Sequence, residues 1–151
     1  MTSRPLPSDD RLAELVLGAI ARHSGDATAD AVQSVHLFGS AASGSLRPDS
    51  DVDLAVLRPG GTPPIDPVAL FDAAQDVAIA VGRDIDLVDL RSTNTVFATQ
   101  IVGYGRRIFT RDEYESDLFI CHTLSEYARL NERRREIIER FESDRRGSRS
   151  A

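Results

Sequence analysis

The segment VHLFGSAASGSLRPDSDVDLAV, residues 35–56, decides how this chain is interpreted. One apolar run ends at Gly39-Ser40, ten residues intervene, and a second apolar run begins with the acidic pair Asp51 and Asp53. Side chains alternate between the two faces of a strand, so these two carboxylates are expected to project from the same face. Neighbouring carboxylates repel each other unless a metal or a shared proton compensates. The segment therefore predicts a cation site beside a turn of small residues.

Gly39 and Ser40 have the chemistry of a phosphate-binding turn. Glycine lets the backbone approach a ligand closely, and serine offers a hydroxyl and an N–H at an expected helix start. Magnesium prefers oxygen ligands and is commonly shared between carboxylates and substrate phosphates. A phosphate turn followed by a carboxylate pair indicates nucleotidyl transfer. The alternative is that Gly39-Ser40 is a plain turn and that Asp51 belongs to the turn before a strand.

This spacing of Gly-Ser and Asp-x-Asp resembles the minimal nucleotidyltransferases of the DNA polymerase β superfamily. Within that superfamily it is most similar to the MNT-domain antitoxins that pair with HEPN-domain toxins. The resemblance covers residues 32–109 by motif. It implies an α/β (α+β) fold, in which a small mixed sheet has helices mainly on one side and a long C-terminal helix follows.

Two Mg²⁺ ions can clamp the attacking and leaving oxygens of an in-line displacement, and two or three carboxylates together with the phosphates can hold them. A third carboxylate on a neighbouring strand is therefore expected. The run DIDLVDL, residues 84–90, offers Asp84, Asp86 and Asp89. Alternation assigns Asp84 and Asp86 to the face opposite the apolar Ile85 and Leu87. The resemblance favours Asp86 as metal ligand or general base, with Asp84 the weaker candidate. The alternative is that all three are solvated or capping acids.

On the phosphate side, the resemblance assigns Gly39 and Ser40 to the β- and γ-phosphates of ATP. Many relatives continue with Ala-Arg-Gly, whereas this chain has Ala42-Ser43-Gly44. Ser43 therefore stands where a cation is common. Arg47 is near enough in sequence to replace that cation, although it could equally be a solvated loop residue.

Hydrophobic periodicity and turn residues predict the remaining elements. Apart from the motif, a loop is expected at residues 25–30 and another, rich in proline and glycine, at 58–67. One domain is expected over residues 1–146, followed by a disordered tail at 147–151. The predicted helices cover residues 8–23, 40–45, 68–81, 94–104 and 112–144, and the predicted strands cover 32–38, 51–57, 84–90 and 106–110.

Composition limits the possible functions. The net charge is −6 and all 18 basic residues are arginine, so an acidic chain without lysine is a poor candidate for direct binding of nucleic acid. No apolar run approaches the ~20 residues of a membrane span. The start of the sequence has no apolar signal region, and the single Cys121 allows no internal disulfide. A cytoplasmic location is therefore expected.

The resemblance also implies a partner and a reaction. MNT antitoxins transfer AMP from ATP to a tyrosine of their HEPN toxin, an RNase, and thereby silence it, so a hetero-oligomer with such a toxin is expected. The predicted C-terminal helix, with Arg133, Arg134 and Arg135 together, is either a solvated amphipathic helix or a partner-binding one. Two other functions stay open: a steric antitoxin that keeps the fold without catalysis, and nucleotide transfer to a small-molecule hydroxyl such as that of an aminoglycoside.

Overall fold

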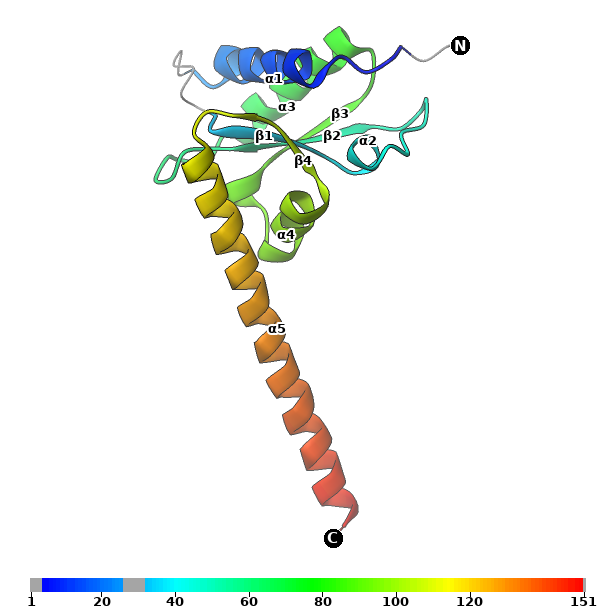
Figure 1. The fold of residues 1–151 in the computed structure, drawn as a ribbon, viewed down its shortest axis with the longest axis vertical. Coiled ribbons are helices and arrows are strands. Elements are labelled where there is room, and N and C mark those ends of the chain that lie inside the picture. Colours follow the sequence, from blue (N-terminus) through cyan, green and yellow to red (C-terminus); the bar gives the residue numbers. More distant parts are fainter. Residues whose placement is uncertain (1–3, 26–31, 151) are drawn as a thin grey trace.

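A four-stranded mixed sheet forms the centre of the computed structural model, which describes residues 4–25 and 32–150. The strands lie in the order β3-β2-β1-β4 (Figure 1). β1 pairs antiparallel with both β2 and β4, and β2 pairs parallel with β3. The bounds are β1 Ser34–Phe38, β2 Val52–Leu57, β3 Ile85–Asp89 and β4 Arg106–Thr110. The four predicted strands are confirmed: the first three have slightly shorter bounds and the fourth has the predicted ones.

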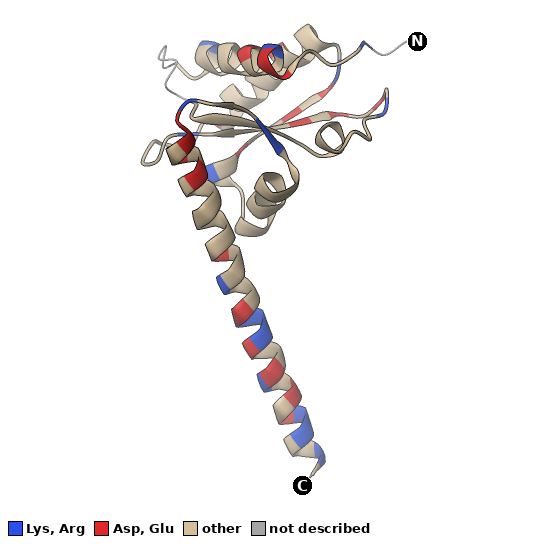
Figure 2. Cartoon of the chain, viewed as in Figure 1, with Lys and Arg blue, Asp and Glu red and all other residues tan. Residues whose placement is uncertain are grey.

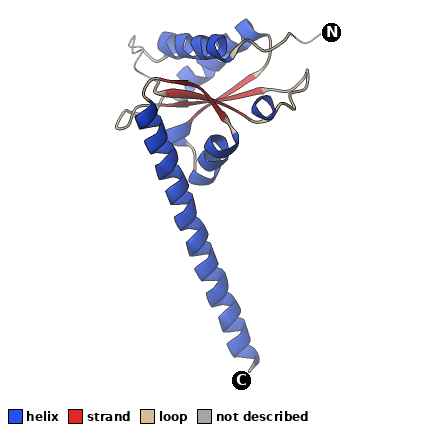
Figure 3. Ribbon diagram, viewed as in Figure 1, coloured by secondary structure: helices blue, strands red, loops and turns tan. Residues whose placement is uncertain are grey.

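Helices cover both faces of this sheet, whereas the resemblance implied one main side (Figures 1 and 3). Helices α1 (Asp9–His23) and α3 (Pro67–Val81) pack together over one face, against the inward side chains of β1, β2 and β3. Helix α4 (Thr95–Tyr104) and the first turns of α5 (Glu113–Arg149) cover the other face. Alternation along β2 feeds both cores, because Leu54 and Val56 face α1 and α3 while Ala55 and Leu57 face α4.

Local sequence explains where these helices begin and end. The Ser8 side chain accepts a hydrogen bond from the Arg11 N–H at the start of α1, and Asp66 caps α3, whose first residue is Pro67. Gly82 ends α3 in the left-handed conformation. The described residues also include two short elements: α2 (Ser40–Ser43) and the 3₁₀ turn η2 (Leu90–Ser92).

The first half of α5 presents an unexpected face to the domain. Its fully buried residues are Ser116 and Thr123, while Leu118 and Leu124 are 52% and 45% exposed and Cys121 is exposed. Cys121 is therefore not a core residue, although free cysteine is among the most often buried residue types. Phe119 packs against the core beneath α4, and a polar contact also anchors this segment, since Ser116 Oγ lies 2.7 Å from Thr110 Oγ. The apolar stripe of α5 faces away from its own sheet.

The second half of α5 leaves the domain altogether (Figure 1). Every residue from 131 to 150 is exposed, a length of about 30 Å at the rise of an α-helix. The helix continues through Gly147 to Arg149, whereas a disordered tail was expected from residue 147. One glycine costs a helix only about 1 kcal/mol, and Arg146 and Arg149 complement the dipole at the C-terminal end. None of the helices in the described ranges combines the length and apolar character needed to span a membrane.

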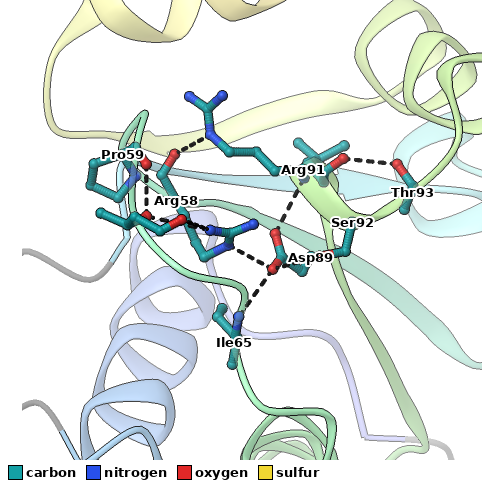
Figure 4. Close-up of polar contacts among 9 residues, drawn as sticks. Arg58, Pro59, Ile65, Asp89, Arg91, Ser92 and Thr93 are labelled. Atoms are coloured by element: carbon teal, nitrogen blue, oxygen red, sulfur yellow. Dashed lines mark hydrogen bonds and ion pairs between the residues drawn. The ribbon is translucent and has the colours of Figure 1, made fainter.

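A buried ion pair fastens the loop after β2 to the end of β3 (Figure 4). Arg58 Nε donates to Asp89 Oδ2 at 2.6 Å, and the two side chains are only 7% and 3% exposed. Asp89 also accepts from the N–H groups of Ile65 and Arg91 and from the hydroxyl of Ser92. Arg91 in turn stacks its guanidinium over Phe119 of α5, 5.1 Å from the ring centroid. The network joins the sheet to the base of α5.

Candidate active site

Three of the predicted site residues meet at one end of the sheet. Gly39 follows β1, Asp53 is the register partner of Phe38 at the end of β1, and Asp86 of β3 is the register partner of Asp53. Asp53 shares its face of β2 with Ala55, so it points toward the α4 side of the sheet. Asp86 shares that face on β3, while Ile85 and Leu87 pack in the opposite core, as alternation predicted.

Gly39 lies directly against the Asp53 carboxylate. It has φ of 67° and ψ of −150°, a conformation that L-residues with a side chain rarely adopt. A Cβ built on Gly39 would overlap Asp53 Oδ2. The glycine is therefore required both by the turn and by the carboxylate behind it.

Gly39→Ala is expected to displace Asp53 and to strain the turn, at a cost of about 1–3 kcal/mol in unfolding free energy. Because the methyl group intrudes on a carboxylate of the site, nucleotidyl transfer should fall by more than the loss of folded protein explains. Activity per folded molecule and thermal unfolding measured on the same sample test this. Gly44→Ala is the matched control, because Gly44 also has a positive φ of 76° but a Cβ there meets nothing within 4 Å. If the two variants lose activity equally, the contact with Asp53 has no special role.

The electrostatics of Asp53 reflect this crowding. Partial burial raises the pKa of the Asp53 carboxyl, and the neighbouring charges of Asp86 and then Asp51 raise it further. All three carboxylates are thus close enough to interact. A raised pKa means that ionised Asp53 is disfavoured in the folded chain, and a bound cation would relieve that cost.

The three carboxylates do not form a closed ligand set. In residues 4–25 and 32–150, no group of three or more His, Cys, Asp and Glu side chains is arranged to hold a metal ion. Asp51 precedes β2. Together with Asp84 and residues of α3, it lines a groove at this end of the sheet. Repulsion favours such separation when no cation is present. The oxygen-only donors and the raised pKa of Asp53 nevertheless fit Mg²⁺.

The turn that follows Gly39 is held by its own small residues. The N–H groups of Ala42 and Ser43 donate to the Gly39 carbonyl, and Ser43 Oγ donates to the Ser40 carbonyl at 3.2 Å. Ser43 therefore closes α2. Ser40 begins α2 and is partly exposed beside Gly39.

Arg47 lies in the loop between α2 and β2 with an exposed side chain. Its backbone is well fixed: the Arg47 N–H donates to Ser50 Oγ at 3.1 Å, and its carbonyl accepts from Arg83 Nη1 at 2.8 Å. Ser50 thus braces the turn before Asp51. The side chain of Arg47 is free to extend from a rigid loop.

His36 is a packed residue of β1. It is 2% exposed, and its Nε2 lies 3.0 Å from Ser34 Oγ. Burial, with a smaller effect of the Arg107 charge, lowers the pKa of His36 to about 4. The ring is therefore neutral near pH 7 and has a structural role.

Tyr104 is a residue near the site that the sequence did not single out. Its side chain is 87% exposed at the end of α4, beside the Gly39 turn. The sequence contains one indication of this position: Phe97, Gln100 and Tyr104 are spaced to lie on one face of a helix, and Gly105 follows them.

Comparisons with known proteins agree with this geometry. A family described as polymerase beta, nucleotidyltransferase, matches residues 27–114. The chain belongs to this nucleotidyltransferase family. It is 37% identical over 108 residues to the protein adenylyltransferase MntA of Shewanella oneidensis, covering 72% of this chain and 75% of MntA.

Solved structures extend the likeness to most of the chain. One, a toxin–antitoxin crystal structure with AMP-PNP, superposes with a TM-score of 0.71 at 32% identity, covering 88% of this chain and 97% of the other. Another contains a tri-AMPylated Shewanella oneidensis HEPN toxin in complex with its MNT antitoxin. It has a TM-score of 0.60 at 32% identity and covers 83% of this chain and 95% of the matched chain. The predicted membership and fold class are confirmed.

Proposed function

We propose that this chain is a Mg²⁺-dependent protein adenylyltransferase that transfers AMP from ATP to a tyrosine of a cognate HEPN toxin and so neutralises it. The observation that carries the proposal is that Gly39, Asp53 and Asp86 lie together at one end of the sheet. The chain is also 37% identical to a protein adenylyltransferase. The AMPylated toxin in the complex of the related antitoxin supports the choice of acceptor.

Each candidate residue at this end of the sheet has a defined role in the proposed reaction. Asp51, Asp53 and Asp86 would hold one or two Mg²⁺ ions, which neutralise triphosphate charge when bound. Gly39 and Ser40 receive the β- and γ-phosphates through backbone and hydroxyl groups, and the exposed Arg47 supplies the cation that Ser43 lacks. Positioning and charge neutralisation supply most of the catalysis, as is usual in phosphate transfer.

The reaction follows from these roles. Asp86 accepts the proton of the acceptor tyrosine, and the phenolic oxygen attacks the α-phosphorus of ATP. The bond between the α-phosphorus and the bridging oxygen breaks, so pyrophosphate leaves on the Gly39 side. The products are a phosphodiester between AMP and tyrosine, pyrophosphate, and one proton that passes from Asp86 to solvent.

Helix α5 supplies the partner surface in this proposal. Large apolar side chains that are between 45% and 71% exposed recur along the whole helix: Tyr114, Leu118, Leu124, Ile137, Ile138 and Phe141. Between residues 131 and 150, seven arginines and five acidic residues are interspersed with the distal apolar residues, and Figure 2 shows both charge signs along this part of the helix. A long helix that exposes apolar side chains among charged ones is typical of a protein-binding helix.

The double variant Ile138→Glu/Phe141→Glu is expected to weaken toxin binding at least tenfold, because two apolar contacts become buried charges. Both side chains are more than half exposed, so the fold should be unaffected. Titration calorimetry with the purified toxin measures the effect. Ile79→Glu, on α3 and 82% exposed, is the matched control. Unchanged affinity in the α5 variant would show that the partner binds elsewhere.

The proposed function is tested by incubating the chain with its toxin, Mg²⁺ and ATP labelled at the α-phosphate. Label on the toxin is expected, whereas label on an aminoglycoside offered in its place would favour the small-molecule reaction. The described residues form one α/β unit and a helix, with no second lobe to enclose a small acceptor. A steric antitoxin would transfer no label at all. One domain over residues 1–146 and a cytoplasmic location stay predictions.

A further inference from the structure

A pocket beside the candidate active site has no role in the proposed reaction. It has a volume of about 290 Å³ and is lined by Phe38, Gly39, Phe97, Gln100, Ile101 and Tyr104. Phe38 and Phe97 meet edge to face, with ring centroids 5.8 Å apart, and form its floor with the buried Ile101. Gln100 and Tyr104 are exposed at its rim, one turn apart on α4.

The pocket is continuous with the site through Gly39. That glycine lines the pocket and also lies against Asp53 Oδ2. Phe38 points to the α4 side of the sheet, as Asp53 does, because the two are register partners on neighbouring strands. A molecule bound beside Asp53 can therefore extend into the pocket while it stays on the α4 side of the sheet.

In the proposed reaction, the acceptor tyrosine is not the group that occupies this pocket. In an in-line displacement the attacking oxygen and the leaving pyrophosphate lie on opposite sides of the α-phosphorus. Asp86, the proposed proton acceptor, is on β3, and β2 separates it from β1 and Gly39. The acceptor must approach from the β3 side, whereas the pocket lies on the β1 and α4 side.

We propose that this pocket binds the nucleobase of ATP, with Tyr104 stacking on the base and the Gln100 amide hydrogen-bonding its polar edge. A nucleobase is a planar apolar ring with donors and acceptors at its rim, and this pocket pairs an aromatic floor with one amide and one exposed aromatic ring. Tyr104 can stack without rearrangement of the core, because it is 87% exposed. The inference rests on the proposed function in taking ATP as the nucleotide.

Tyr104→Ala and Gln100→Ala test the inference by calorimetry with ATP and, separately, with inorganic tripolyphosphate, both in the presence of Mg²⁺. Loss of a stacking partner should raise the Kd for ATP about tenfold in Tyr104→Ala and leave the Kd for tripolyphosphate unchanged. Gln100→Ala should give a smaller rise, again for ATP alone. Phe71→Ala is the matched control, because Phe71 is an exposed aromatic residue on α3 and has no part in the proposed site, and it should change neither value.

Three results would overturn the inference: an unchanged Kd for ATP in Tyr104→Ala, equal losses for ATP and tripolyphosphate, or the same rise in Phe71→Ala. A fall in the unfolding temperature of Tyr104→Ala would be separated from a binding defect by the tripolyphosphate control. Failure of the proposed function is distinguishable, because the wild-type chain would then bind ATP but transfer no AMP to the toxin.

Discussion

Replacing Asp51 and Asp53 by asparagine is expected to reduce AMP transfer to the toxin by about 10³-fold or more. The substitutions remove two of the three charges that would hold Mg²⁺ at the end of β1 and β2. Folding should survive them. Burial and the neighbouring charges raise the pKa of Asp53, so ionisation of this carboxyl opposes folding as the pH rises above the ordinary aspartate range. A neutral residue at this position should therefore preserve or raise the Tm near pH 7.

Labelled transfer rates and thermal unfolding of the same samples measure both effects. Asp49→Asn, in the exposed turn before Asp51, is the matched control and should transfer AMP at the normal rate. Asp86→Asn should lose transfer as the paired variant does, and full activity with normal folding would remove Asp86 from the mechanism. Retained transfer in the Asp51→Asn/Asp53→Asn variant would refute the carboxylate pair as the metal site.

Asp89→Ala is expected to give the largest loss of stability, about 3–5 kcal/mol, because it leaves the Arg58 guanidinium charged and buried. The same change removes the acceptor for the Ile65 and Arg91 N–H groups, and so loosens the link from the sheet to α5. For a domain of this size the Tm should fall by roughly 10 °C. Chemical denaturation gives the free energy directly.

Two further variants separate the buried pair from ordinary surface ion pairs. Asp117→Ala breaks the pair with Arg107, whose aspartate is 63% exposed, and should cost less than about 1 kcal/mol. The double variant Arg58→Met/Asp89→Leu should recover much of the loss, since no unpaired charge remains. If Asp89→Ala unfolds at the wild-type temperature, Arg58 has found solvent or another partner and the network is not a structural link.

The sequence predicted most of the sheet because its information there is local. Alternation within β2 and β3 predicts which face of the sheet carries Asp53, Asp86, Ile85 and Leu87. Capping residues at the ends of α1 and α3 fix where these helices begin and end. The sequence could not show which helix covers which face, because alternation separates two sides without saying what lies on either. The presence of helices on both faces needed the three-dimensional structure.

Helix α5 shows the limit of periodicity most clearly. Leu118, Cys121 and Leu124 recur at helical spacing, yet the domain packs against Ser116, Phe119 and Thr123 instead. Periodicity finds an apolar face but does not say whether that face meets the same chain or another one. The exposure of Tyr104 and the pairing of Arg58 with Asp89, 31 residues away, are likewise set by tertiary contacts.

The central claim is that this chain modifies its toxin covalently, and the intact mass of the toxin tests it most directly. The purified toxin is weighed after incubation with ATP and Mg²⁺ in the presence of either the wild-type chain or the Asp51→Asn/Asp53→Asn variant. The account predicts a gain of one or more AMP units with the wild type and none with the variant. A toxin of unchanged mass that is nonetheless neutralised by both would contradict it, and would show that the chain inhibits by binding alone.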